Sequence, residues 1–128
     1  MVKYLLDTNI IIDLLRGTSP ETKQLIVSLG ISNCAISDIT LYELYVGVEL
    51  FGGPDGEAAI ERIVGGLTVL PSKDGFREAA RQYVRLKAKV ETIEDLDLFI
   101  GCTAIVNDLY MVTGNVKQLS RLENIRIL

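Results

Sequence analysis

Four side chains of this sequence have the chemistry of a divalent-cation site. They are Asp7, Glu43, Asp97 and Asn115. Asp7 and Asn115 each follow a short apolar run, and Glu43 and Asp97 lie near the starts of helical segments, so all four can meet at one rim of an α/β fold. Clustered carboxylates repel one another unless a hard cation lies between them. An all-oxygen ligand set without histidine or cysteine favours Mg²⁺ or Mn²⁺ over zinc, and such an ion supports phosphodiester hydrolysis.

Glu43 is the most informative of the four because of its neighbours. In the expected helix it shares one stripe with Ile39, Val46 and Leu50. A charge inside an apolar face costs on the order of several kcal/mol unless it is paired, protonated or coordinated to a cation. Three explanations therefore remain open: a bound cation, a salt bridge to a Lys or Arg, or a stripe edge that reaches solvent.

The other three residues also have structural explanations. Asp7 can cap the helix that follows it. Asp97 can complement the positive end of a helix dipole, and Asp95 is the alternative candidate for the side chain that points inward. Asn115 occurs in a turn-forming sequence. The functional interpretation therefore depends on these side chains lying together in space.

The composition excludes several kinds of active site. The 128 residues are enough for one domain, 1–128, with a single core. The sequence contains no histidine, which excludes Ser-His-Asp triads, Cys-His nucleophiles and His-ligated zinc. Lys plus Arg is 13 and Asp plus Glu is 17, so the net charge is -4 and no basic field binds nucleic acid non-specifically. A bound cation would supply the positive charge that the chain lacks.

The cysteines and the apolar residues indicate the cellular compartment of the protein and its partners. Cys34 and Cys102 have no CxxC spacing and are expected to be buried thiols in a reducing compartment. Acidic residues interrupt the apolar N-terminus, and no uncharged run approaches the roughly 20 residues of a membrane span, so we expect a cytoplasmic protein with no membrane partner. Hydrophobic residues make up 48% of the chain, more than a small domain comfortably buries. This excess predicts a homodimer or a protein partner.

Short apolar runs alternate with helical patterns along the whole chain, which predicts an α/β fold whose mostly parallel sheet has helices on both faces. Strands are expected at 2–6, 34–37, 67–70, 109–112 and 125–127. Helices are expected at 10–17, 20–29, 38–51, 57–64, 74–90, 95–107 and 116–122, with a turn at 52–56. The expected apolar face of the longest helix consists of Phe76, Ala79, Ala80, Tyr83, Leu86 and Val90. Gly101 is expected to permit a close backbone approach.

Four motifs occur in an order that resembles the PIN-domain family. They are LLDTN at 5–9, ISDITLYEL at 36–44, DLFIGC at 97–102 and VTGN at 112–115. The chain looks most like the VapC-type ribonuclease toxins of type II toxin–antitoxin systems, and the likeness extends over nearly its whole length. The resemblance implies a PIN-like three-layer sandwich, in which a mostly parallel central sheet lies between helices on both faces.

The same resemblance implies an activity, a set of ligands and partners. It implies a Mg²⁺- or Mn²⁺-dependent endoribonuclease in which Asp7, Glu43 and Asp97 match the three acidic positions of the family. Asp7 and Asp97 would bind the metal, and Glu43 would hold a water or a second ion. The matching hydroxyl positions, as pocket or phosphate contacts, are Thr8, Ser37 and Thr113. The family also implies dimerisation and inhibition by a cognate antitoxin whose basic side chain enters the acidic pocket.

The sequence departs from the family pattern at two positions. Asn115 supplies a neutral amide where the family often has Asp, and Leu119 stands where an aromatic residue often follows. The amide carbonyl can still bind a cation or fix a water, so the change bears more on a second metal than on activity.

One helix face carries a basic stripe. Arg77, Arg81 and Arg85 recur every four residues, and they form either a plain solvated face or a set of contacts to an RNA backbone.

Other functions are compatible with parts of the sequence. The alternative function is a non-catalytic PIN-like module that binds RNA or protein, and Asn115 is its main support. A phosphatase with Asp7 as nucleophile is disfavoured because Asn9 replaces the second Asp of an Asp-x-Asp pair. No Gly-rich nucleotide-binding loop follows any expected strand.

Overall fold

The apolar runs pair as a five-stranded sheet in the order β3-β2-β1-β4-β5, and every neighbouring pair is parallel. The computed structural model describes residues 1–52 and 54–128. Its strands are β1 (Tyr4–Leu6), β2 (Cys34–Ser37), β3 (Thr68–Leu70), β4 (Tyr110–Val112) and β5 (Arg126–Ile127). The register pairs Leu6 with Val112 at the ends of β1 and β4. The residues that follow these two strands, Asp7 and Thr113, therefore emerge side by side.

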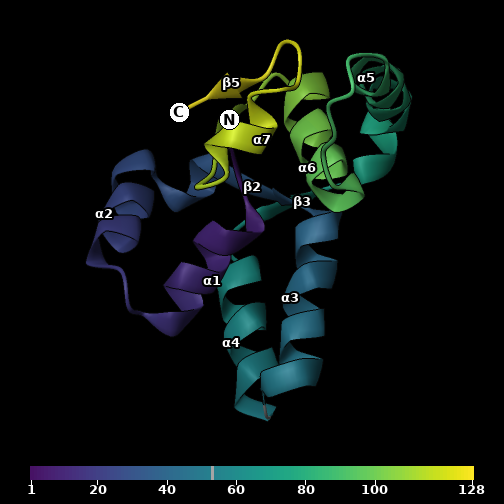
Figure 1. Cartoon of the computed structure of the whole chain (residues 1–128). Helices are drawn as coiled ribbons and strands as arrows, with labels where there is room; N and C mark the ends of the chain where they lie inside the picture. The colour runs from purple at the N-terminus through teal and green to yellow at the C-terminus, as the bar shows by residue number, and fades with distance from the viewer. Residues whose placement is uncertain (53) are drawn as a thin grey trace.

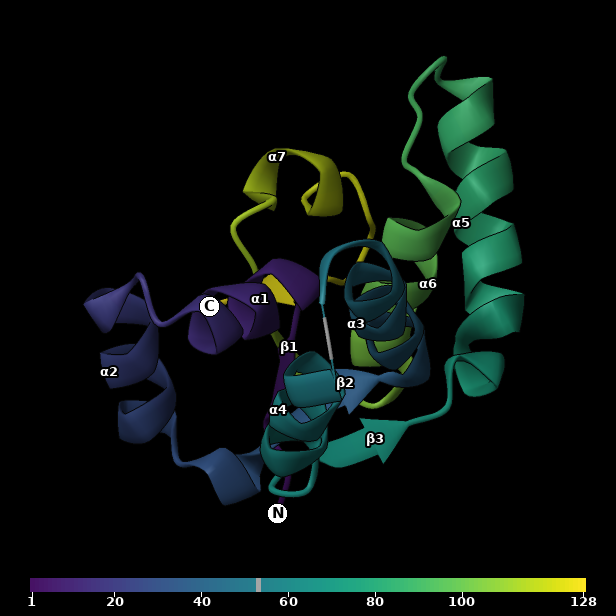
Figure 2. The same cartoon turned by 90° about the horizontal axis from the view of Figure 1, so that it is seen from below.

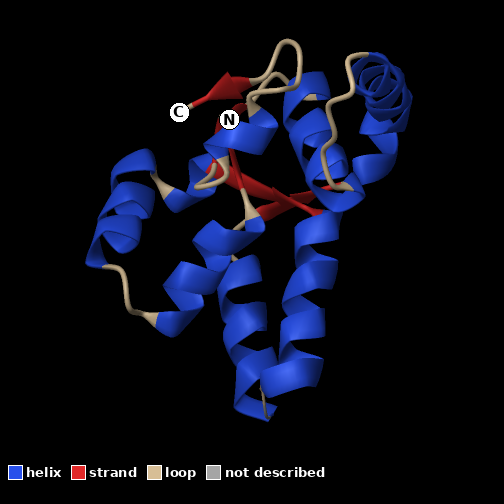
Figure 3. Cartoon of the chain, in the orientation of Figure 1, coloured by secondary structure: helices blue, strands red, loops and turns tan. Residues whose placement is uncertain are grey.

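Helices cover both faces of the sheet, as the sequence predicts (Figure 1, Figure 3). They are α1 (Thr8–Arg16), α2 (Pro20–Leu29), α3 (Asp38–Phe51), α4 (Pro54–Val64), α5 (Phe76–Ala88), α6 (Asp95–Val106) and α7 (Val116–Leu119), with short 3₁₀ turns at Ile31–Asn33 and Ser72–Gly75. α1 and α2 lie on the side of the molecule opposite to α5 and α6 (Figure 2). α3 and α4 form an antiparallel pair that extends away from the sheet (Figure 1).

The sheet divides the hydrophobic interior into two clusters, where the sequence analysis expects a single core. Successive strand residues point to opposite faces, so the fully buried Leu5 and Leu6 pack in different clusters. Leu5 packs with Ile100 of α6, whereas Leu6 packs with Ile11 of α1 and Leu44 of α3. Both faces are buried because crossover helices cover parallel strands on both sides.

Capping residues fix the starts of two helices where the sequence predicts them. The Thr22 N–H donates to the Ser19 hydroxyl before α2, and Pro20 occupies the first helical position. The Ile39 N–H donates to the Ser37 hydroxyl before α3. Each bond satisfies one of the N–H groups that a helix start leaves without an internal partner.

The expected helix 116–122 ends at Leu119, and two other expected segments differ more from the structure. The expected helix 74–90 is a 3₁₀ turn followed by α5, whose buried residues are Ala79, Gln82 and Leu86. Phe76 and Tyr83 of the expected apolar face are exposed, because the polar Gln82 takes the central buried position. The expected turn 52–56 is helical from Pro54 onward, since proline at a first helical position and acidic residues in the first turn favour a helix start. Gly53 lies outside the described residues.

The close backbone approach occurs at Gly75 and not at Gly101. A Cβ on Gly75 would lie 3.1 Å from the backbone carbon of Cys102, which cannot move aside. A Cβ on Gly101 would instead meet the Leu122 side chain, 2.4 Å from its Cδ1. The small residue that lets another segment pack on the α6 backbone is therefore the last residue of the 72–75 turn.

Gln82 joins α5 to the loop after α7. Its side chain is fully buried, and its amide binds the Glu123 peptide at two points. Gln82 Nε2 donates to the Glu123 carbonyl at 3.0 Å, and the Glu123 N–H donates to Gln82 Oε1 at 3.1 Å. Nε2 also donates to Glu78 Oε2 at 2.8 Å. Both amide hydrogens and the amide oxygen are thus used, as a buried polar group requires.

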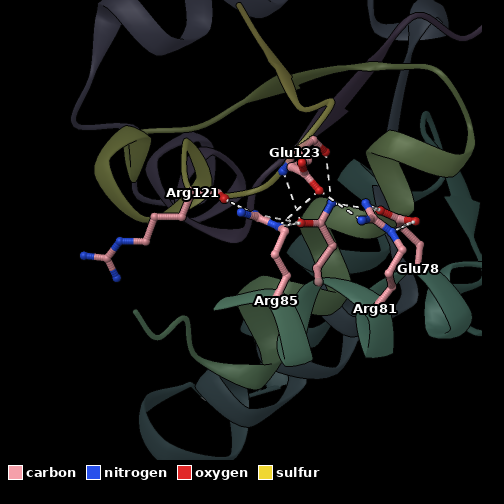
Figure 4. A network of polar contacts seen from close by, with 6 residues as sticks. Glu78, Arg81, Arg85, Arg121 and Glu123 are labelled. Atoms are coloured by element: carbon pink, nitrogen blue, oxygen red, sulfur yellow. Dashed lines mark hydrogen bonds and ion pairs between the residues drawn. The ribbon is translucent and has the colours of Figure 1, made fainter. Parts of the chain in front are cut away.

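Arginines of the same helix extend this network (Figure 4). Arg81 forms ion pairs with Glu78 at 2.7 Å and with Glu123 at 2.9 Å. Its hydrogen bond to Glu78 lowers the pKa of that carboxyl. Arg85 pairs with Glu123 at 3.2 Å and donates to the Arg121 carbonyl. The stripe that the sequence analysis treats as solvated or RNA-binding thus has partners inside the chain at Arg81 and Arg85, whereas Arg77 is exposed.

The surface of α3 carries exposed apolar side chains. The exposed fractions of Tyr42, Leu50 and Phe51 are 58%, 66% and 89%. These residues account for part of the apolar excess in the composition. Within the described part of the chain, no helix has both the length and the apolar character needed to cross a bilayer.

Candidate metal centre

Asp7 is held at the carboxyl end of β1 by two donors. The Thr8 N–H donates to Asp7 Oδ1 at 2.8 Å, which caps α1. The Thr113 hydroxyl, just after β4, donates to Asp7 Oδ2 at 2.6 Å. Asp7 is 4% exposed, so both carboxylate oxygens have a fixed direction in a nearly closed environment. The capping role and the pocket position that the sequence analysis treats as alternatives occur together.

Thr8 links the first carboxylate to the second. Its backbone N–H binds Asp7, and its hydroxyl donates to Glu43 Oε1 of α3 at 2.7 Å. The apolar stripe expected around Glu43 is not buried, because Val46 and Leu50 are 38% and 66% exposed. The reason is that the outer turns of α3 extend beyond the sheet with α4 (Figure 1). Glu43 is half-buried and is oriented by a hydroxyl, not by a basic side chain.

Asp97 completes the acidic group from the first turn of α6. Burial, and then the charges of Asp7, Glu43 and Glu94, raise the pKa of Asp97 to about 6. The repulsion from Asp7 and Glu43 places the three carboxylates in one electrostatic environment, although they are far apart in the sequence. Asp95 is exposed, so Asp97 is the inward side chain of the two candidates.

Asn115 lies against Asp97 and is tied to the rest of the pocket. Its side-chain amide donates to Asp97 Oδ2 at 3.4 Å, and its backbone N–H donates to the Thr113 hydroxyl at 2.8 Å. Each carboxylate therefore accepts from one polar side chain: Asp7 from Thr113, Glu43 from Thr8 and Asp97 from Asn115. These contacts fix the orientation of the acidic groups without neutralising their charge.

The donor set fits a hard divalent cation. The four ion pairs found in the described residues involve none of Asp7, Glu43 and Asp97. Three carboxylates thus share a pocket without a basic partner, and a cation would relieve this repulsion. In residues 1–52 and 54–128, no group of three or more acidic or cysteine side chains has the spacing of a formed metal site. An ion here would therefore have to be held by one or two of the carboxylates together with bound waters, a coordination that Mg²⁺ accepts.

Other predicted residues have different surroundings. The Ser37 hydroxyl caps α3, and in the described part of the chain it forms no hydrogen bond with the three carboxylates. Arg81 and Arg85 are engaged with Glu123 in the network of Figure 4. Of the three predicted hydroxyl positions, Thr8 and Thr113 form hydrogen bonds with the carboxylates, whereas the bonds of Ser37 in residues 1–52 and 54–128 are to α3 itself.

Thr40 is a member of the site that the sequence analysis missed. It lies on α3 and is fully buried, and its hydroxyl is 3.0 Å from that of Thr8. The available signal was its spacing, because residues three apart share a helix face and Thr40 precedes Glu43 by three positions.

Comparisons with known proteins show to which family this chain is similar. The family model described as PIN domain matches residues 4–124. The chain is 30% identical over 131 residues to Ribonuclease VapC2 of Haemophilus influenzae, covering 98% of this chain and 96% of that protein. It is 34% identical over 118 residues to Ribonuclease VapC19 of Mycobacterium tuberculosis, covering 88% of this chain and 89% of that protein. The structure is similar to a chain in a crystal structure of DNA-bound VapBC from Salmonella typhimurium, with a TM-score of 0.91 and 28% identity. The match covers 100% of this chain and 98% of that chain.

Proposed function

Because this chain belongs to the PIN-domain family, we propose that it is the endoribonuclease toxin of a toxin–antitoxin pair and hydrolyses RNA at the pocket of Asp7, Glu43 and Asp97. The observation that supports this site is the hydrogen-bond network through which Thr8, Thr113 and Asn115 link three carboxylates that form no ion pair among the described residues. The proposed domain is the whole chain, 1–128.

Each pocket residue has a proposed task. Asp7 and Asp97 would hold Mg²⁺ or Mn²⁺, which supplies a positive charge for the phosphoryl oxygen and activates water. Glu43 orients water through its carboxylate, which the Thr8 hydroxyl holds at Oε1. Asn115 orients Asp97 and adds no negative charge to the pocket.

The experiment is RNA cleavage by the purified protein with Mg²⁺, Mn²⁺ or EDTA. We expect cleavage with either metal and none with EDTA. Asp7→Asn is expected to lower the rate by roughly 10²-fold or more, comparable to the loss of an electrostatic catalytic group, while it keeps the helix cap because Asn also caps helices. Asp13→Asn, on the same helix, is the control and is expected to leave the rate unchanged.

Two results would contradict metal-dependent cleavage at this pocket. One is RNA cleavage that continues in EDTA, and the other is RNA cleavage at an unchanged rate by Asp7→Asn. Complete absence of cleavage, together with RNA binding, would favour the alternative, a non-catalytic binding module. That alternative draws its support from the neutral Asn115 in place of an acidic residue.

We further propose that the antitoxin occupies an apolar groove between α1, α3 and α4. The groove has a volume of about 360 Å³, and its lining includes Ile12, Leu15, Leu44, Val48, Phe51 and Ile60. Glu43 and Arg16 also line it, so the groove borders the proposed site at one of its three carboxylates. An amphipathic segment with a basic side chain would match both the apolar lining and the charge.

Gly47 offers a test of this antitoxin site. It lines the groove, and a Cβ there would meet no atom within 4 Å. Gly47→Leu is therefore expected to fill the groove without strain, keep RNA cleavage and weaken inhibition by the cognate antitoxin by roughly tenfold or more, or about 1.4 kcal/mol. Gly47→Ala is the smaller control. Unchanged inhibition of the Gly47→Leu protein would rule out this groove as the docking site.

We also propose a cytoplasmic homodimer. The exposed Tyr42 and Leu50 of α3 provide apolar surface for a second copy, and both cysteines are buried thiols, as expected in a reducing compartment. Light scattering is expected to give twice the monomer mass. A monomer mass at every concentration would contradict the homodimer.

A further inference from the structure

We infer that Thr40 is a positioning residue of the pocket, which holds Glu43 for the divalent cation by acting through the Thr8 hydroxyl. This inference rests on the proposed function. Thr40 lies one layer behind the carboxylates and contacts neither RNA nor cation in this scheme. Its effect depends on two consecutive hydrogen bonds.

The direction of both bonds follows from the number of available protons. A hydroxyl has one proton to donate. The Thr8 hydroxyl donates it to Glu43 Oε1 at 2.7 Å. In its 3.0 Å contact with Thr40, the Thr8 oxygen must therefore accept, and the Thr40 hydroxyl must donate. The result is a directed chain from Thr40 to Thr8 to Glu43.

The position of Thr40 indicates that its hydroxyl serves this chain. A threonine inside a helix commonly donates to the carbonyl four residues earlier. Thr103 of α6 does so, because its hydroxyl donates to the Phe99 carbonyl at 2.8 Å. Thr40 is as fully buried as Thr103, but it lies in the first turn of α3, where the residue four positions earlier, Ile36, belongs to β2. No carbonyl of its own helix is in that position, and its hydroxyl partner among the described residues is Thr8 on another helix. Thr40 therefore connects α3 to α1 at the pocket.

The chain gives Glu43 a preferred orientation. A hydroxyl that accepts one hydrogen bond becomes a stronger donor in the next, so Thr40 strengthens the bond from Thr8 to Glu43. Thr8 also binds Asp7 through its backbone N–H, and fixing Thr8 thereby fixes one carboxylate relative to another. Outer partners of this kind change metal affinity or activity by about 10- to 100-fold.

The experiment compares Mn²⁺ affinity, measured by electron paramagnetic resonance on the purified full chain, among threonine variants. Thr40→Val removes the donor and keeps the shape, and we expect about tenfold weaker Mn²⁺ binding with a similar loss in kcat and an unchanged KM for RNA. Thr40→Ser keeps the donor and is expected to bind Mn²⁺ like the wild type. Thr103→Val is the matched control for loss of a buried threonine hydroxyl, and it too is expected to bind normally.

A double variant tests whether Thr40 acts through Thr8. Thr8→Val is expected to weaken Mn²⁺ binding, and adding Thr40→Val to it should cause no further loss. Equal Mn²⁺ binding by wild type and Thr40→Val, or equal losses in Thr40→Val and Thr40→Ser, would overturn the positioning role while RNA cleavage by the wild type upholds the nuclease. A wild type that neither binds Mn²⁺ nor cleaves RNA would overturn both.

Discussion

Replacing Asp97 by Asn is expected to abolish metal-dependent RNA cleavage and, at the same time, to make the metal-free protein more stable at pH 7. Activity falls because a proposed metal ligand loses its charge. Stability rises because the cost of burying a charge, and then the repulsion from Asp7 and Glu43, which together raise the pKa of Asp97 to about 6, are removed. With an ordinary value of 3.8, the difference sets an upper bound of about 3 kcal/mol at 1.36 kcal/mol per pKa unit, and solvent screening of this half-buried side chain makes the expected gain smaller than that bound.

The pH dependence of stability has a definite direction. Between pH 3.8 and about 6 the folded chain binds a proton at Asp97 that the unfolded chain has released. The contribution of Asp97 therefore destabilises the fold increasingly as pH rises through this window, and the full cost is present above it. Thermal unfolding of wild type and Asp97→Asn should show a stability difference that is large at pH 7 and small near pH 4.

Asp95 provides the matched control for this substitution. It lies in the same first turn of α6 but is exposed. Asp95→Asn is expected to change neither cleavage nor the unfolding temperature appreciably. Added Mn²⁺ should stabilise the wild type and not Asp97→Asn, since only a bound ligand shifts unfolding by mass action. If Asp97→Asn were less stable than the wild type at pH 7, the negative charge of Asp97 would have to be stabilised by an interaction other than the contacts described for this pocket.

Replacing Gln82 by Leu is expected to cost about 2 to 4 kcal/mol in the free energy of unfolding. Leucine fits the buried space but removes both hydrogen bonds to the Glu123 peptide and the bond to Glu78. The N–H and carbonyl of Glu123 then lose the partners that hold the loop to α5. Urea unfolding monitored by circular dichroism would measure the loss.

Gln24 on α2 serves as the control for Gln82, because its side chain is exposed. Gln24→Leu is expected to stay within about 0.5 kcal/mol of the wild type, as surface substitutions usually do. If Gln82→Leu unfolded at the same urea concentration as Gln24→Leu, the amide bonds to Glu123 would not be important for stability.

Much of the fold could be predicted because its signals are local. The strand 34–37 has the predicted bounds, and the helix 20–29 begins at its Ser-Pro pair. The buried face of α5 could not be predicted in this way. Hydrophobicity favours Phe76 and Tyr83, but the buried position belongs to Gln82, whose burial depends on a peptide 41 residues away. Similarly, Gly75 packs on α6 through a contact that no local pattern indicates.

The sequence indicated which residues belong to the candidate site better than it indicated how their side chains contact one another. Strand ends indicated Asp7 and Asn115 because parallel strands finish at one edge of the sheet. The expectation for Glu43 started from a stripe that turned out to be exposed, since the sequence does not show that α3 extends past the sheet. Thr40 was missed because a buried threonine hydroxyl looks like any core residue until its partner on α1 is known.

The double engagement of Asp7 restricts how this protein can vary over evolutionary time. The same side chain begins the first helix and forms the edge of the pocket, through Oδ1 to Thr8 and Oδ2 to Thr113. Most inherited changes at position 7 would therefore alter folding and chemistry together. Asparagine, a good helix cap without a charge, is an exception that would keep the cap while silencing the pocket, and it marks a path from a nuclease to an inert descendant with an intact fold.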